Sequence, residues 1–153
     1  MRADPGVASV TFDEPNGALY PFSLADKLER ITERHPWYTP EDGPTSPWGT
    51  AYLPMEMVSV LAHKTERAWP VRQPSVGLFL DLEVRMVEGP VLVGRPYEVA
   101  SEIVGLGESR RTESFWTRTT LVDAETRRLC CEVLLHQGVF KDSYPGYPHA
   151  SGG

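Results

Sequence analysis

Apolar residues recur at helical spacing near the start of the chain. Leu24, Leu28 and Ile31 fall on one face of a helix, which predicts an amphipathic helix over residues 24–33. Ser23, which is followed three residues later by an aspartate, resembles a capping box at the start of that helix.

A second helical run, from Met55 to about Arg67, is apolar around most of its circumference. Pro54 suits the first turn of a helix, and the cationic side chains of Lys64 and Arg67 suit the last turn. A helix that is apolar on nearly every side is buried in a core. We therefore expect this helix to lie at the centre of the molecule.

From residue 76 onward the apolar period changes from helical to alternating. Leu80, Leu82 and Val84 alternate with charged residues, which predicts a half-buried strand. Further strands are expected over residues 7–12, 91–93, 97–104, 114–122 and 129–140.

The order of these elements predicts the fold class. Short connections between strands favour antiparallel pairing. One apolar helix needs a sheet to cover it, and the sheet needs a helix on its concave face. We therefore predict an α+β fold in which a curved antiparallel sheet wraps around one central helix. A single domain is expected over residues 1–141, followed by a Pro/Gly-rich tail of residues 142–153.

Composition and charge exclude several classes of protein. The chain of 153 residues suffices for one domain, and 21 acidic against 15 basic residues give a net charge of −6, the wrong sign for a nucleic-acid-binding protein. No apolar run approaches the ~20 residues of a membrane-spanning helix, and the N-terminus lacks the apolar segment of a secretion signal. Cys130 and Cys131 are adjacent, which disfavours a disulfide, and no Cys/His set has the spacing of a zinc site. We expect a cytoplasmic protein without a metal or cofactor.

A proline- and glycine-rich loop over residues 36–54 leads directly into the second helix. The stretch Tyr20–Leu61 resembles the MaoC-like and FAS1-like dehydratase group of hotdog-fold enzymes, which act on acyl thioesters. In that group a D-x-N-P-x-H motif is followed by a loop that ends in a segment like G-x-I-A-P-P, and then by the central helix. Here residues 33–38 read ERHPWY and residues 46–54 read SPWGTAYLP, while GPVLVGRP of residues 89–96 is similar to the group's R-P-L-x-x-G-D turn. The resemblance implies the hotdog fold.

The resemblance also implies a catalytic set. In dehydrating members the Asp and His of the motif act on Cα and Cβ of the substrate. Here Glu33 stands in place of that Asp, His35 in place of the Asn and Tyr38 in place of the His. A tyrosine with an ordinary pKa of ~10 is a poor base at neutral pH, so a base would have to come from His35 or from Glu56 on the central helix. The altered dyad equally implies a non-catalytic subunit that partners an active hotdog paralogue.

Glu56, Ser59 and His63 form a polar stripe on the otherwise apolar second helix, at positions i, i+3 and i+7. We expect the stripe to face an acyl pocket, with Glu56 as acid or base and with Ser59 and His63 as substrate-binding residues. The alternative is a stripe that faces solvent or another chain. Some hotdog thioesterases carry a catalytic carboxylate on this helix, so the resemblance also leaves open a thioesterase that uses Glu56.

Four further residues are candidates for substrate binding. Trp37 and Trp48 would line an apolar acyl channel, although packing in a core is the commoner fate of tryptophan. Arg110 and Arg111, in a loop between strands, would hold the phosphates of coenzyme A or of a phosphopantetheine arm, against the alternative of solvated charges.

The sequence therefore favours a hydratase or dehydratase that acts on a 3-hydroxyacyl or enoyl thioester of coenzyme A or acyl-carrier protein. The alternatives are a non-catalytic acyl-binding subunit, the thioesterase using Glu56 and, in another fold, a cone-shaped α+β barrel of the ketosteroid-isomerase type. A sheet of this kind leaves an edge strand exposed, and hotdog proteins usually join two sheets at such edges. We expect a homodimer or a heterodimer with a hotdog paralogue.

Overall fold

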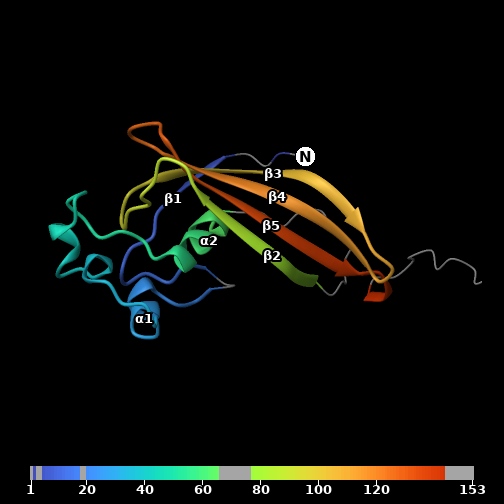
Figure 1. Cartoon of the computed structure of the whole chain (residues 1–153), viewed down its shortest axis with the longest axis horizontal. Helices are drawn as coiled ribbons and strands as arrows, with labels where there is room; N and C mark the ends of the chain where they lie inside the picture. The colour runs from blue at the N-terminus through green and yellow to red at the C-terminus, as the bar shows by residue number, and fades with distance from the viewer. Residues whose placement is uncertain (1, 3–4, 18–19, 66–76, 144–153) are drawn as a thin grey trace, which may run out of the picture.

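The computed structural model describes residues 2, 5–17, 20–65 and 77–143. Within these ranges, antiparallel strands form a five-stranded sheet in the order β1-β3-β4-β5-β2 (Figure 1). The strands are β1 (Gly6–Ala8), β2 (Gly77–Met86), β3 (Tyr97–Glu108), β4 (Thr112–Asp123) and β5 (Leu129–Phe140). The helices are α1 (Leu24–Leu28) and α2 (Met55–His63), with the short 3₁₀ turns η1 (Pro36–Tyr38), η2 (Gly43–Thr45) and η3 (Lys141–Ser143). None of the helices described is long and apolar enough to cross a bilayer.

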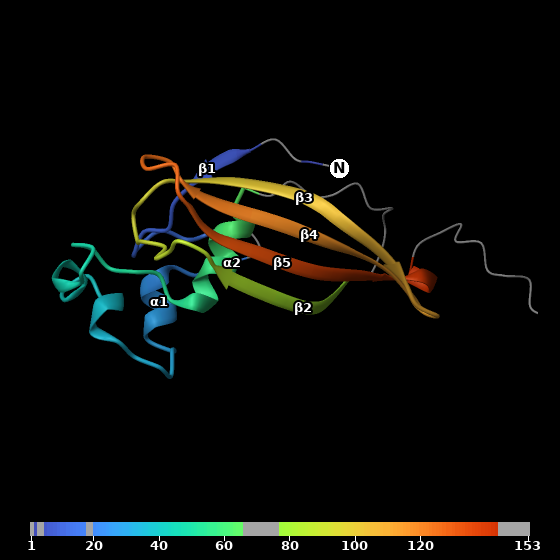
Figure 2. The ribbon, with the colours of Figure 1, turned by 45° about the horizontal axis from the view of Figure 1, so that its top comes forward.

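Helix α2 lies against the concave face of the curved sheet, as Figures 1 and 2 show. Met57 and Leu61 are fully buried in one core with residues of β4 and β5. Burying side chains of this size contributes about 1.5–3 kcal/mol each. The prediction of a central helix is confirmed. The helix ends at His63, and the predicted end at Arg67 and the tail residues 144–153 lie outside the described residues.

The long central strands β3, β4 and β5 show the alternation that the sequence predicts. In β4, Thr117, Thr119 and Leu121 face the core and are buried, whereas Arg118 between them is exposed. The hydroxyl of Thr119 is hydrogen-bonded at 2.7 Å to that of Ser101 on β3, so the two buried hydroxyls satisfy each other. The predicted curved antiparallel sheet around one helix is therefore confirmed.

The first helix is shorter than predicted. Its capping box is present, because Ser23 Oγ accepts the Asp26 N–H at 3.1 Å and Asp26 Oδ2 accepts the Ser23 N–H at 3.0 Å. The helix nevertheless ends at Leu28, and the predicted extension to residue 33 is wrong. Of the three apolar positions that predicted it, only Leu24 is fully buried, and a helix this short depends on packing for its stability.

The strand expected over residues 91–93 is a loop contact instead. Leu92 forms a single β-bridge with Tyr52, so this segment pairs with the stretch that precedes α2. Gly94, with a positive φ of 77°, then turns the chain into β3. Strand β1 is also shorter than the expected 7–12, because only three of its residues pair with β3.

Strand β2 forms one edge of the sheet and is more exposed than its alternation predicts. Phe79 is 66% exposed and Leu82 is 36% exposed, while Leu78 and Val84 are partly buried. Figure 2 shows that α2 lies beside the C-terminal half of β2 and does not extend along its N-terminal half. The prediction of a half-buried strand is therefore wrong for most of β2 within the described residues.

Candidate functional site

The loop that carries the motif-like residues begins at η1. His35 caps this turn, since its Nδ1 accepts the Trp37 N–H at 3.1 Å, and Pro36 occupies the first position of the turn. A neutral histidine whose Nδ1 accepts a hydrogen bond carries its proton on Nε2. Because His35 is exposed, it presents an Nε2–H donor to its surroundings; Glu33, two residues earlier, is also exposed.

Aromatic side chains of the loop pack around His35. The rings of Tyr38 and Tyr52 meet edge to face with centroids 4.8 Å apart, and those of Trp37 and Trp48 meet at 6.2 Å. Pairs of this geometry contribute about 0.5–1.5 kcal/mol each beyond their burial. The cluster gives a Pro/Gly-rich loop a defined shape and brings together the residues predicted there.

Tyr38 is a hydrogen-bond donor at neutral pH. Burial is the main cause that raises the pKa of its hydroxyl above the ordinary value, and the charge and hydroxyl of Tyr52 add to that effect. The carboxylates of Glu33 and Glu56 lie near enough to raise the Tyr38 pKa further. The side chain is therefore suited to donating a hydrogen bond and not to removing a proton.

Glu56 lies in the first turn of α2 and reaches across to α1. Its Oε2 is 2.7 Å from Lys27 Nζ, and this hydrogen bond raises the pKa of Lys27 above its ordinary value against a smaller opposing effect of burial. The Glu56 side chain is 43% exposed. A carboxylate that is partly open to solvent is accessible to a bound molecule and can accept a proton from it.

The other two members of the polar stripe bond to the helix itself. Ser59 Oγ donates to the Glu56 carbonyl oxygen at 3.2 Å, and His63 Nδ1 lies 2.6 Å from the Ser59 carbonyl oxygen. These contacts satisfy side-chain groups within α2. The structure therefore gives Glu56 a partner on another element, whereas these contacts of Ser59 and His63 are local.

Arg110 and Arg111 lie apart from the residues above. They occupy the turn between β3 and β4, and both are exposed. Figure 1 shows this turn at the end of the sheet opposite to α1 and the loop around η1. The structure does not bring the two arginines together with His35, Tyr38 or Glu56.

A pocket of about 190 Å³ lies beside α1. It is lined by Tyr20, Phe22, Asp26, Lys27 and Arg30. The Tyr20 hydroxyl lies 3.7 Å from the sulfur of a buried methionine of α2, and Lys27 connects the pocket to the first turn of α2. Sequence reasoning missed this site. In the sequence, two aromatic residues precede the capping box and two cationic residues follow it. This order alone does not indicate a pocket, because only the fold brings the four side chains together.

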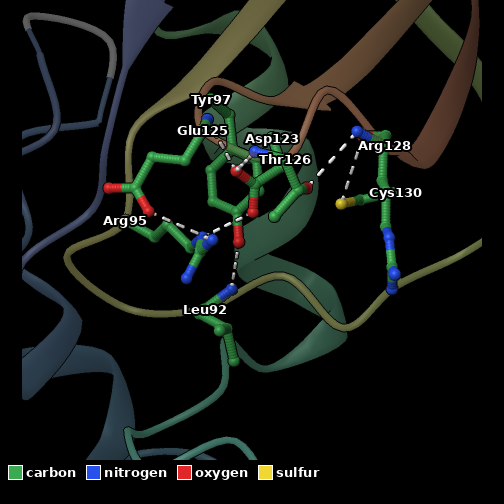
Figure 3. Close-up of polar contacts among 8 residues, drawn as sticks. All are labelled: Leu92, Arg95, Tyr97, Asp123, Glu125, Thr126, Arg128 and Cys130. Carbon is green, nitrogen blue, oxygen red and sulfur yellow. Dashed lines mark hydrogen bonds and ion pairs between the residues drawn. The ribbon is translucent and has the colours of Figure 1, made fainter.

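Asp123 is a buried carboxylate at the end of β4, shown in Figure 3. It accepts the N–H groups of Glu125 at 2.8 Å and Thr126 at 3.0 Å, and it forms an ion pair with Arg95. Burial acts to raise the pKa of Asp123, but the hydrogen bonds from Thr126 and Arg95 outweigh it and hold the pKa below its ordinary value. These contacts fix the turn between β4 and β5 against the turn that leads into β3.

Tyr97, Cys130 and Cys131 are buried near this cluster, and their side chains are poorly reactive at neutral pH. Burial raises the pKa of Tyr97 to about 12, and the hydroxyl accepts the Leu92 N–H at 2.6 Å. Burial also raises the pKa of the Cys130 thiol, and that of Cys131 to about 11. Thiols with raised pKa values are poor nucleophiles at neutral pH. Among the described residues, no group of His, Cys, Asp and Glu side chains could hold a metal ion.

No family model and no curated relative matches the sequence. Solved structures do match. The HadBC complex of Mycobacterium tuberculosis, a 3R-hydroxyacyl-ACP dehydratase, aligns over 90% of this chain and 94% of that chain, with a TM-score of 0.64 and 16% identity. A MaoC-like dehydratase from Rhodospirillum rubrum aligns over 92% and 90%, with a TM-score of 0.61 and 12% identity. An (R)-hydratase from A. caviae aligns over 90% and 92%, with a TM-score of 0.59 and 14% identity. The chain has a hotdog fold.

The resemblance to the MaoC-like hotdog group is therefore confirmed for the fold. The cone-shaped barrel considered as an alternative is excluded, because α2 lies inside a single curved sheet. At 12–16% identity the likeness lies in the backbone. The chemistry of this hotdog depends on its own side chains.

Proposed function

We propose that this hotdog protein is a hydratase or dehydratase acting on an enoyl or 3-hydroxyacyl thioester of coenzyme A or acyl-carrier protein. The observation that supports the proposal is the position of η1. Tyr38 in this turn and His35, which caps it, pack against Tyr52, two residues before the proline that precedes α2. Glu56 follows in the first turn of that helix. The Glu56 carboxylate lies near enough to Tyr38 to raise its pKa, which supports a site that combines two hydrogen-bond donors with a carboxylate.

In the proposed hydration, Glu56 takes a proton from water while the water oxygen bonds to Cβ of the enoyl thioester. Glu56 then delivers that proton to Cα, so that water has added across the double bond. The Nε2–H of His35 and the hydroxyl of Tyr38 donate hydrogen bonds to the thioester oxygen, where negative charge develops as the enolate forms. Dehydration follows the same steps in reverse.

The test is the loss of enoyl absorbance when the purified protein meets crotonyl-CoA. Glu56→Gln is expected to lower the rate by about 10²–10⁴-fold, the range of general acid–base catalysis. Glu29→Gln, at the exposed C-terminal end of α1, is the matched control and should keep the wild-type rate. Full activity in Glu56→Gln would show that another group is the base.

A second candidate is an acyl-binding hotdog subunit without catalysis. The observation that favours it is the 2.7 Å ion pair between Lys27 and Glu56, because this carboxylate already has a cationic partner and is a weaker base for it. Such a subunit binds acyl-CoA, leaves the enoyl absorbance unchanged and assembles with an active hotdog chain. Release of free thiol from acyl-CoA would instead identify a thioesterase that uses Glu56.

The partner in this proposal is a second hotdog chain at the edge of β2. Phe79, Leu82 and Met86 are exposed there, and β2 is the last strand of the sheet on that side. A copy of this chain or a paralogue can pair with such an edge and cover its apolar side chains. The free, buried thiols of Cys130 and Cys131 suit the reducing conditions of the cytoplasm, where we propose that the protein acts.

A further inference from the structure

The pocket beside α1 combines aromatic rings with cations and contains none of the proposed catalytic residues. Tyr20 and Phe22 form an aromatic wall, with ring centroids 5.5 Å apart and ring planes at 79°. Lys27 lies in α1, and Arg30 follows two residues after its end. An apolar wall beside two cations is typical of a site for an anion that carries an apolar stem.

Of the two cations in the pocket, Arg30 is better placed than Lys27 to bind an anion. Its guanidinium lies 5.7 Å from the centroid of the Phe22 ring, a cation–π contact that orients the group and leaves its N–H edge available. In the part of the chain that the structure describes, no carboxylate lies within ion-pair distance of Arg30. A carboxylate or phosphate could therefore bind it through two parallel hydrogen bonds.

Asp26 is the one carboxylate of the pocket lining, so its charge offsets one of the two positive charges of Lys27 and Arg30 and leaves an excess of one. The hydrogen bonds from the backbone and side chain of Ser23 are the main causes that lower the pKa of Asp26. The charge of Arg30 has the smallest effect on it. Asp26 thus serves the start of α1, while the cations lie farther along the chain.

Lys27 faces both the pocket and Glu56. Its Nζ is 2.7 Å from Glu56 Oε2, and its side chain is 30% exposed. An anion in the pocket would share Lys27 with Glu56, so the two negative charges compete for one ammonium group. Removing the charge of Glu56 should therefore strengthen anion binding.

The volume limits the ligand. About 190 Å³ is below the ~300–1,000 Å³ of pockets that hold drug-sized molecules, so the pocket suits a small ligand. We propose that this pocket binds a compact oxyanion on a short apolar stem, an alkyl carboxylate or an alkyl phosphate. The head lies between Lys27 and Arg30, and the stem lies against Tyr20 and Phe22.

The test is an NMR titration of the ¹⁵N-labelled full chain with butyrate, butyl phosphate and inorganic phosphate. Saturable shifts are expected for the backbone amides of residues 26–30, with a dissociation constant on the order of 1 mM for the preferred probe. Butyl phosphate should bind about tenfold more tightly than inorganic phosphate, because only the ester has an apolar stem. The tighter of butyrate and butyl phosphate identifies the head group.

Variants test the assignment without relying on catalysis, so it can fail independently of the proposed hydratase. Arg30→Gln, at an exposed position that should not affect folding, is expected to weaken binding at least about tenfold. Glu56→Gln should strengthen it about threefold, and Arg110→Gln on the distant β3–β4 turn should leave it unchanged. Equal affinity in Arg30→Gln and wild type, or shifts that do not saturate by about 20 mM of any probe, would overturn the proposal.

Discussion

Lys27 and Glu56 join helices α1 and α2 through an ion pair of 2.7 Å. Their side chains are 30% and 43% exposed, so solvent screens the pair and its contribution to the free energy of unfolding is at most about 1 kcal/mol. The main effect that we expect of this ion pair is to orient the Glu56 side chain. It holds the carboxylate of Glu56 in one direction at the end of α2 where the aromatic loop also lies.

Replacing Lys27 should therefore affect the reaction more than the stability. In Lys27→Met the free energy of unfolding, measured by urea denaturation, should change by less than about 1 kcal/mol. The kcat/KM for crotonyl-CoA hydration should fall about tenfold, because Glu56 is no longer oriented. The control is Arg85→Met, which removes an exposed ion pair with Glu132 on β2 and β5 and should leave kcat/KM unchanged. Equal losses of activity in the two variants would contradict the positioning role.

The Arg95–Asp123 pair is expected to affect the stability more than the reaction. Asp123 is only 9% exposed, and Arg95→Met leaves its carboxylate with backbone donors alone. The free energy of unfolding at pH 7 should fall by about 1–3 kcal/mol. Arg127→Met is the matched control: its pair with Glu98, at 2.9 Å, is more exposed, so its loss should lower the free energy of unfolding less than Arg95→Met does.

The lowered pKa of Asp123 also predicts how stability depends on pH. A carboxyl whose pKa is lower in the folded state stabilises the fold fully above its ordinary value of ~3.9, and this contribution is lost as the pH falls through the folded-state pKa. Between pH 5 and pH 3 (roughly the range in which carboxyls protonate), the wild type should lose more stability than Asp123→Asn. Urea unfolding at both pH values measures the difference. A parallel loss in the two proteins would assign the acid sensitivity to other carboxyls.

The central features of the hotdog were predictable because they depend on local patterns. Helix α2 is apolar on nearly every side, and in β4 the buried Thr117, Thr119 and Leu121 alternate with outward residues such as Arg118. Such patterns report burial directly. The loop residues His35 and Tyr38 are candidates through the resemblance to the D-x-N-P-x-H motif, whose proline the structure places at the start of η1.

The features that were not predictable depend on what one element meets in space. Glu56 and Lys27 are 29 positions apart, and neither has a neighbour in sequence that indicates the pair. Leu82 has the alternation of a half-buried strand, but its exposure is set by the short length of α2 and by the position of β2 at the edge of the sheet. The pocket around Arg30 likewise exists only because α1 ends early and packs beside the segment that precedes it.

The exposed edge of β2 predicts where subunits meet. Leu82→Arg places a charge among the apolar side chains of that edge and should convert the oligomer to a monomer, as measured by size-exclusion chromatography with light scattering. Val7→Arg, at a 64% exposed position on β1 at the opposite edge, is the control and should keep the assembly intact. Dissociation by Val7→Arg alone would move the interface to the β1 edge.

The proposed role of the Tyr38 hydroxyl can be tested by a substitution that removes only its oxygen atom. Tyr38→Phe removes the hydroxyl but keeps the ring that packs on Tyr52 at 4.8 Å, so the free energy of unfolding should change by less than about 1 kcal/mol. If the hydroxyl stabilises the developing enolate, kcat should fall about 10²–10³-fold with little change in KM, the effect of losing one such donor. Tyr52→Phe keeps its ring and the Tyr38 hydroxyl, and it should lower kcat by less than about threefold.

The pH dependence of kcat separates this donor role of Tyr38 from a role as a base. Burial raises the pKa of Tyr38 above the ordinary ~10, so the hydroxyl stays protonated at every lower pH and can donate throughout that range. On the alkaline side, a reaction that needs the protonated Tyr38 therefore loses activity only above about pH 10, whereas one that needs the phenolate would gain activity as the pH rises toward that value. A rate that increases steadily between pH 8 and pH 10 in the wild type, and not in Tyr38→Phe, would contradict the donor role and make Tyr38 the base.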